Sequence, residues 1–284
     1  MRFDWSKMGR TPPAALVAAR NLAHHAAQWA TKAARANLSA VPDDSHSAFT
    51  WDTLHAALVS QVLPAKGGGV RVGIRIARLE LIVTSGSHVL DAFQLDGKTD
   101  AAAGAWIDSK LHALGLKPAA SVKLPYSLPD HPAGGRPHQI SMMGRELGEL
   151  SRWFAGPAET LEEFAAQLRG LRPGPGPVLC WPHHFDIATL VRFDESGGDT
   201  ARSVGMGISP GDEFYAQPYA YVSPWPRFDA GGLPQLPLPG RWHTDGFFGA
   251  VATGEEILAM QDRGRALLAF ITGAFEVGRA KLGA

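Results

Sequence analysis

The segment Val178–Phe193, with the sequence VLCWPHHFDIATLVRF, places three titratable side chains inside an otherwise apolar run. Its apolar residues recur at alternate positions, which predicts a strand with one face against the core. His184 and Asp186 then share the opposite face, while His183 points toward the core. Buried imidazoles and carboxylates cost free energy unless they are paired or used. The segment therefore predicts a strand of the core that also carries a functional site.

The remaining sequence alternates between helical and strand-like patterns. Amphipathic helices are predicted at Ala14–Leu38 and from Thr253 to the end of the chain, where Thr253 and Glu256 have the spacing of a capping box. His24 and His25, in the first helix, are expected to be solvated or capping residues. Strands are predicted for Val70–Ile76 and for a four-stranded antiparallel meander: Val178–Phe193, Ala201–Ser209, Gln217–Trp225 and Arg241–Val251. We therefore expect an α+β fold, in which antiparallel sheets in two strand-rich halves are backed by helices.

A stretch rich in Pro, Gly and His, between residues 125 and 138, is expected to separate the two halves. The predicted division is an N-terminal α+β half over residues 1–130 and a C-terminal α+β half over residues 138–284, packed as one compact unit. Two helices are expected just after this stretch, at Met142–Phe154 and Thr160–Arg169, the second opened by a capping box of Thr160 and Glu163.

Composition excludes several classes of partner. Lys+Arg and Asp+Glu number 27 each, so no net field favours nucleic acid or an anionic membrane. No stretch of about eighteen apolar residues predicts a membrane span. One cysteine, Cys180, fits a reducing compartment, and the first residues lack the apolar core of a signal peptide. We expect a cytoplasmic protein that acts on or binds a small molecule, and the sequence does not indicate its oligomeric state.

A second polar cluster, Arg241–Asp245 with the sequence RWHTD, has the same alternation. Arg241, His243 and Asp245 fall on one face of a strand. Together with the first cluster they predict a metal site in which His184, Asp186 and His243 form a 2-His-1-carboxylate set for iron or zinc. Arg241 would hold an anionic group of the substrate and Asp245 would orient His243.

The predicted function is thus a metal-dependent enzyme, of the non-haem iron or zinc type, acting on a small organic molecule. A 2-oxoglutarate-dependent reaction is disfavoured because the first basic residue after His243 is the distant Arg263. Two alternatives stay open. One is a metal-free protein that binds a small ligand in a groove walled by Tyr219, Tyr221 and Trp225, and the other is a structural or interaction protein whose histidines serve packing alone.

Four stretches of the chain carry a resemblance to a known family: TWDTLHAAL at Thr50–Leu58, HHFDIATLVRF at His183–Phe193, the run Ser203–Pro226 and LLAFITGAFEVGRAKL at Leu267–Leu282. Over most of residues 50–284 the chain resembles a bacterial family of domains of unknown function. That resemblance implies an α+β fold and no particular activity. Members of the family have other residues at the positions of His183 and His184, so the resemblance implies that a metal site using these histidines would be confined to this branch.

Overall fold

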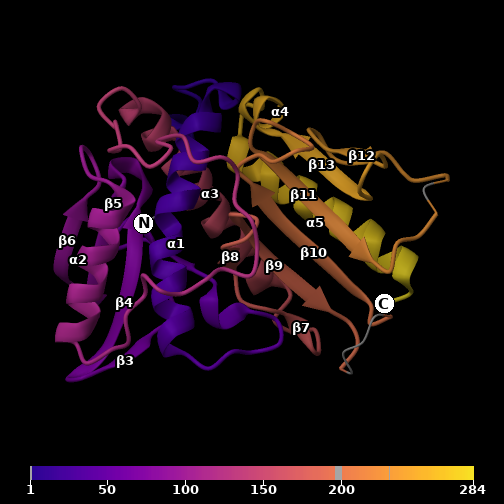
Figure 1. The fold of residues 1–284 in the computed structure, drawn as a ribbon. Coiled ribbons are helices and arrows are strands. Elements are labelled where there is room, and N and C mark those ends of the chain that lie inside the picture. The colour runs from indigo at the N-terminus through magenta and orange to yellow at the C-terminus, as the bar shows by residue number, and fades with distance from the viewer. Residues whose placement is uncertain (1, 196–199, 230) are drawn as a thin grey trace. The chain divides into compact units, whose positions relative to one another are not determined.

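A computed structural model of the chain describes residues 2–195, 200–229 and 231–284. It confirms the predicted α+β class, since the described residues form two antiparallel sheets accompanied by helices (Figure 1). The chain divides into two compact units. We call Ala15–Arg152 with Leu179–Phe185 the N-terminal unit, and Met1–Ala14, Trp153–Val178 and Asp186–Ala284 the C-terminal unit. The stretch between residues 125 and 138, at which the sequence analysis divides the chain, lies inside the N-terminal unit.

The N-terminal unit contains a sheet whose strands follow the order β1-β2-β4-β5-β6, with β3 paired to β4. The helix α1, which realises the predicted N-terminal helix, packs against β4 and against α2. The bounds of these elements are β1 Thr50–Asp52, β2 Ala57–Val59, β3 Leu63–Ala65, β4 Gly68–Arg75, β5 Glu80–Ser85, β6 His88–Gln94, β8 Leu179–Trp181, α1 Val17–Asn37 and α2 Asp100–Ala113.

The polar side of α1 is buried to a degree that the sequence analysis did not predict. His24 is only 5% exposed. Its ring stacks on Phe185 with the centroids 4.8 Å apart, and its Nε2 lies 2.7 Å from the carbonyl oxygen of Pro182. The side chain of Gln28 donates to the same oxygen at 2.9 Å. The expectation of a solvated His24 is therefore wrong, because this side of the helix is buried against the turn that follows β8 and binds the Pro182 carbonyl in it.

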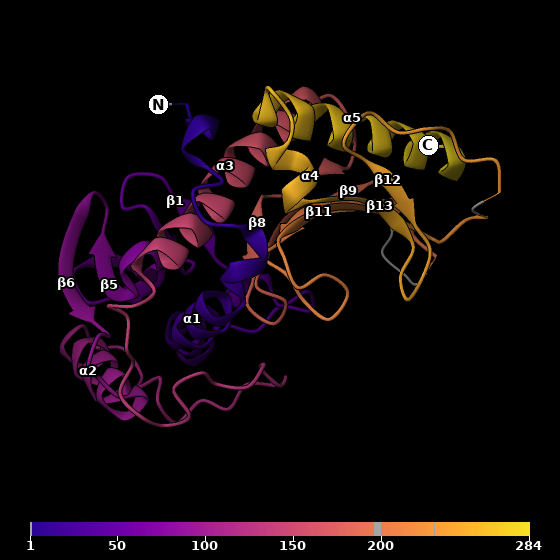
Figure 2. The ribbon, with the colours of Figure 1, turned by 90° about the horizontal axis from the view of Figure 1, so that it is seen from above.

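The C-terminal unit contains the second sheet, with the strand order β12-β13-β11-β10-β9-β7. Helix α5 runs along one face of this sheet (Figure 2) and packs against β10 and β11. The bounds are β7 Gly174–Pro175, β9 Asp186–Arg192, β10 Ser203–Ser209, β11 Tyr219–Trp225, β12 Arg241–His243, β13 Gly249–Thr253, α4 Gly254–Leu258 and α5 Arg263–Leu282. The predicted capping box is confirmed: Thr253 accepts from the backbone of Glu256, whose carboxylate accepts from the Thr253 N–H at 2.7 Å.

Two of the four predicted meander strands are each divided in the structure. The run from Val178 to Phe193 becomes β8 and β9, because the Phe185 N–H closes a tight turn onto the Trp181 carbonyl and Phe185 itself adopts a positive φ of 59°. The run from Arg241 to Val251 becomes the hairpin β12–β13. Gly246, with a φ of 79°, supplies the left-handed backbone in its loop. Polar side chains within an apolar run thus marked turns rather than one long strand.

The two helices expected after residue 142 are one helix, α3, which spans Gly144–Gln167 and contains Pro157. Thr160 does not cap a new helix; its hydroxyl donates to the carbonyl of Gly156 at 3.2 Å within the continuous one. A proline removes a single backbone donor, and the buried side chains Trp153, Phe154, Leu161 and Phe164 hold the helix in place on both sides of it. Within the described residues, no helix combines the length and apolar character needed to cross a bilayer.

Candidate functional site

The face of the C-terminal sheet opposite α5 carries polar side chains. One row across five strands consists of directly paired residues: Ala188, Gly207, Tyr221, Val251 and Arg241. Asp186 and His243 are each two residues along their strands from this row, so they point to the same face. The register therefore gathers Asp186, Arg241 and His243 on one face of one sheet.

Each of these three side chains is engaged within the C-terminal unit. Asp186 accepts a hydrogen bond from the Tyr221 hydroxyl, and burial raises the pKa of that hydroxyl. Arg241 forms an ion pair with Glu256 at 2.5 Å, so its charge is already matched.

His243 is held through both ring nitrogens. Its Nε2 lies 2.5 Å from the backbone carbonyl of Asp245, and its Nδ1 lies 2.8 Å from the Tyr215 hydroxyl. Since a carbonyl only accepts, Nε2 carries a proton, and in the neutral ring Nδ1 accepts from the Tyr215 hydroxyl. Asp245 thus orients His243 through its main chain rather than through its carboxylate.

His184 belongs to the other unit. It lies exposed in the turn after β8, where its ring contacts that of His183 with the centroids 4.2 Å apart. The predicted ligand set of His184, Asp186 and His243 therefore draws on both units and stays a prediction.

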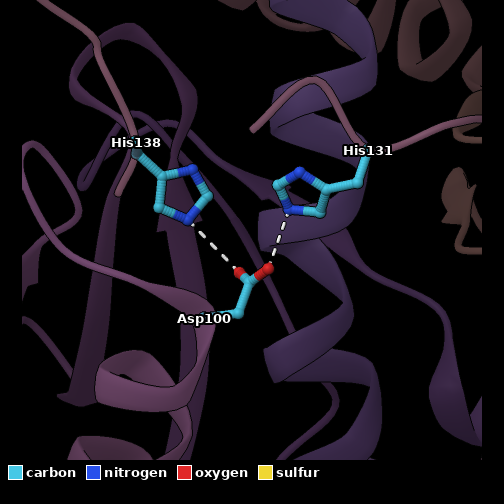
Figure 3. A group of neighbouring side chains, drawn as sticks. All are labelled: Asp100, His131 and His138. Carbon is cyan, nitrogen blue, oxygen red and sulfur yellow. Dashed lines mark hydrogen bonds and ion pairs between the residues drawn. The ribbon is translucent and has the colours of Figure 1, made fainter. Parts of the chain in front are cut away.

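A cluster of two imidazoles and one carboxylate forms inside the N-terminal unit. Asp100, His131 and His138 each offer a ligand atom, and these atoms lie within 4.8 Å of one another. In the described part of the chain, no other group of three or more His, Cys, Asp or Glu side chains brings its potential ligand atoms this close together. Figure 3 shows the two rings side by side over the Asp100 carboxylate, each with one nitrogen near a different oxygen.

The carboxylate stands at the first residue of α2. Thr99 caps this helix, because its hydroxyl accepts from the backbone N–H of Ala102 at 3.2 Å. The N-terminus of a helix stabilises negative charge. The hydrogen bond from His138 lowers the pKa of Asp100, and electrostatic interaction with His131 and His138 acts in the same direction, although burial opposes both effects. Asp100 is therefore an ionised carboxylate at neutral pH.

The backbone between β6 and α2 fixes His138. The carbonyl of His138 accepts a hydrogen bond from the Gly97 N–H at 2.8 Å. The N–H of His138 donates to the Lys98 carbonyl at 2.9 Å. Two residues after His138, the N–H of Ile140 donates to the Asp96 carboxylate at 2.8 Å. The His138 side chain is fully buried, and its Nε2 lies 3.2 Å from Oδ1 of Asp100.

His131 is fixed by the turn that it begins. Its carbonyl accepts from Gly134 at 2.9 Å, and its Nδ1 accepts from the Ala133 N–H at 3.0 Å. Its Nε2 lies 2.8 Å from Oδ2 of Asp100, but it is not aligned as a hydrogen bond to that oxygen. Both His131 and His138 thus lie in irregular backbone that is held by specific hydrogen bonds.

The imidazoles have hydrogen-bonding capacity that the described residues do not use. His131 Nε2 and His138 Nδ1 are both buried and have no aligned hydrogen-bond partner there. Buried polar atoms in this state cost about 1–3 kcal/mol each. Of these two atoms, His138 Nδ1 has the lone pair in the neutral ring, because Nε2 donates to Asp100. The arrangement therefore favours a further group, such as a cation or a proton donor, at this nitrogen.

This cluster was missed by reasoning from the sequence. His131 and His138 lie in the stretch that reads as a linker, and a spacing of two histidines in a Pro- and Gly-rich loop is not specific. Asp100 resembles any acidic residue in a first helical turn. Their proximity depends on the pairing of Asp96 with His138, which has no local sequence signal.

A second feature, a hollow of about 870 Å³, lies in the C-terminal unit among the first residues, α3 and the start of α5. Several of its charged side chains are paired with one another or with the main chain. Arg2 contacts Glu163 at 2.9 Å, and Arg263 donates to the carbonyls of Trp5 and Met8 at 3.1 and 2.8 Å. These contacts fasten the N-terminal residues to the unit and do not converge on a common point.

Comparison with known proteins adds no assignment: no family model, no curated protein and no solved structure matches the chain. The resemblance to a bacterial family of domains of unknown function therefore stays a prediction.

Proposed function

We propose that the N-terminal unit binds a divalent metal ion through Asp100, His131 and His138, and that this ion serves a reaction on a small organic molecule. The observation that supports the proposal is the approach of three ligand atoms to within 4.8 Å of one another. The residue types are those expected from the sequence, at different positions in the chain. We further propose a cytoplasmic location, which the use of a single cysteine, Cys180, in the whole sequence fits.

The ligand set favours particular chemistry. Two imidazoles and a carboxylate hold zinc in catalytic sites that keep a fourth position for water or substrate. The same set holds ferrous iron with open positions for substrate and oxygen. In either case an open position lets the ion polarise a bound oxygen atom. The donors alone do not select between these metals.

Metal content and thermal stability test the proposal. Protein purified without chelator or affinity tag is expected to hold about one equivalent of a divalent metal, and adding metal at about 100 times its Kd should stabilise the fold by about 2.7 kcal/mol. Asp100→Asn and His138→Ala should abolish both effects. His112→Ala is the matched control, because His112 is an exposed histidine at the end of α2 in the same unit.

Two outcomes would count against this site. Wild-type protein that holds less than about a tenth of an equivalent and gains no stability from added zinc, iron, manganese or cobalt would remove the metal altogether. Protein that loses its metal on His243→Ala but keeps it on His138→Ala would return the site to the ligands predicted from the sequence.

A further inference from the structure

His25 lies beside the proposed metal site. Its ring contacts the ring of His131 with the centroids 4.3 Å apart and the planes tilted by 46°. Asp100, His131 and His138 are all near enough to act electrostatically on it. It is nevertheless outside the group whose ligand atoms lie within 4.8 Å of one another. His25 therefore lies beside the cluster without being one of its three potential ligands.

The hydrogen bonding of His25 fixes which nitrogen is an acceptor. Nε2 lies 2.6 Å from the carbonyl oxygen of Pro129. A carbonyl cannot donate, so the neutral ring keeps its proton on Nε2 and leaves a lone pair on Nδ1. Among the described residues no hydrogen bond to Nδ1 is found. His25 therefore presents an oriented acceptor next to the cluster, held by the same segment that carries His131.

We propose that His25 Nδ1 accepts a hydrogen bond from the hydroxyl group or water coordinated at an open position of the metal. This rests on the proposed function and narrows it: the molecules that the site selects are those that bind the metal through an O–H group, such as 2-hydroxy acids. An acceptor beside the metal leaves a coordinated ether without this contact, because an ether oxygen has no hydrogen to donate.

A matched pair of probes tests the role of His25. Glycolate and methoxyacetate offer the metal the same carboxylate and the same second oxygen, but only glycolate has the O–H. Their binding is measured by the visible spectrum of the Co(II)-loaded protein. Wild-type protein is expected to prefer glycolate over methoxyacetate by about five- to tenfold more than the His25→Phe variant does, as one hydrogen bond contributes. Affinity for Co(II) itself should be unchanged.

Three results would overturn the role of His25 while leaving the metal site in place. They are an equal preference in wild type and His25→Phe, a loss of Co(II) in His25→Phe, which would make His25 a ligand, and a nitrogen NMR spectrum of the wild-type protein that places the neutral proton on Nδ1. The last measurement needs no variant. Failure of wild-type protein to bind any metal would instead overturn the proposed function.

Discussion

Gly207 and Tyr221 are direct partners across β10 and β11, and the Tyr221 hydroxyl fills the space that a side chain on Gly207 would need. A Cβ placed on Gly207 would lie 2.7 Å from that oxygen and 2.7 Å from the Cβ of Ala188. Gly207 is therefore required by the close approach of its neighbours, since its own φ is not in the left-handed region. The same tyrosine hydroxyl donates to Asp186. The absence of a side chain at Gly207 on β10 therefore leaves room for a buried hydrogen bond between Tyr221 on β11 and Asp186 on β9.

Gly207→Ala should destabilise the protein by about 1–3 kcal/mol, because an added methyl group in a packed site forces its neighbours to shift. Chemical denaturation measures this. Gly205→Ala is the matched control on the same strand and face, where the nearest atom to an added Cβ is 3.7 Å away at ordinary contact distance. Equal costs for the two substitutions would show that the close approach to Tyr221 is not the cause.

Tyr221→Phe should cost about 1.5–3 kcal/mol of stability, because it removes a hydrogen bond to a buried carboxylate. Tyr219→Phe, on the same strand, removes a bond of 2.5 Å to Asp212. Asp212 is only half-buried and also accepts from the backbone of Phe214, so water can replace the lost donor and the cost should stay below about 1 kcal/mol. Both variants are unfolded in the same denaturant. A larger loss of stability in Tyr219→Phe than in Tyr221→Phe would contradict this account.

The stability of the metal-free protein should fall in acid through His24. Burial lowers the pKa of His24 to about 4, from 6.5 when unfolded. Between these values the unfolded state binds the extra proton, so stability falls as pH falls and is unaffected above the unfolded pKa. The contribution between about pH 7.5 and about pH 5 is roughly 2 kcal/mol.

His24→Gln keeps a donor for the Pro182 carbonyl but does not titrate. Denaturation of both proteins in the presence of EDTA should therefore show a pH dependence that is smaller in the variant by about that amount. If wild type and His24→Gln lost the same free energy on acidification, His24 would not be the group responsible.

Metal binding should change the environment of the Ala133 amide. This N–H now donates to Nδ1 of His131. Coordination through Nε2 places the single proton of a neutral ring on Nδ1, which then cannot accept. Titration with Zn²⁺, followed by amide NMR, should show faster hydrogen exchange at Ala133. The amide of Gly97, which donates to the His138 carbonyl, is the internal reference and should keep its protection.

The parts of the fold that follow a periodic pattern were predictable from the sequence. The alternation in Ser203–Ser209 and Tyr219–Trp225 gave β10 and β11, the apolar spacing after Ala14 gave α1, and Thr253 with Glu256 gave the start of α4. The same alternation correctly places Asp186, Arg241 and His243 on one face, because register and phase are properties of strands.

Features that depend on contacts between distant segments were not predictable. The break predicted between Phe154 and Thr160 does not form, because burial of the residues on both sides of Pro157 keeps α3 continuous. The burial of His24 depends on the carbonyl of Pro182, which is 158 residues away. The cluster of Asp100, His131 and His138 is the extreme case, because neither histidine lies in a segment with any periodicity that could fix the direction of its side chain.

Neither sheet supplies a ligand to the proposed metal site; one comes from the tip of a helix and two from the loop that precedes α3. A single inserted or deleted residue between His131 and His138 should disrupt the proposed metal site without changing the strand pairing in either sheet. Changes confined to this loop can therefore alter the proposed metal site while the pairing of the strands in both sheets stays the same.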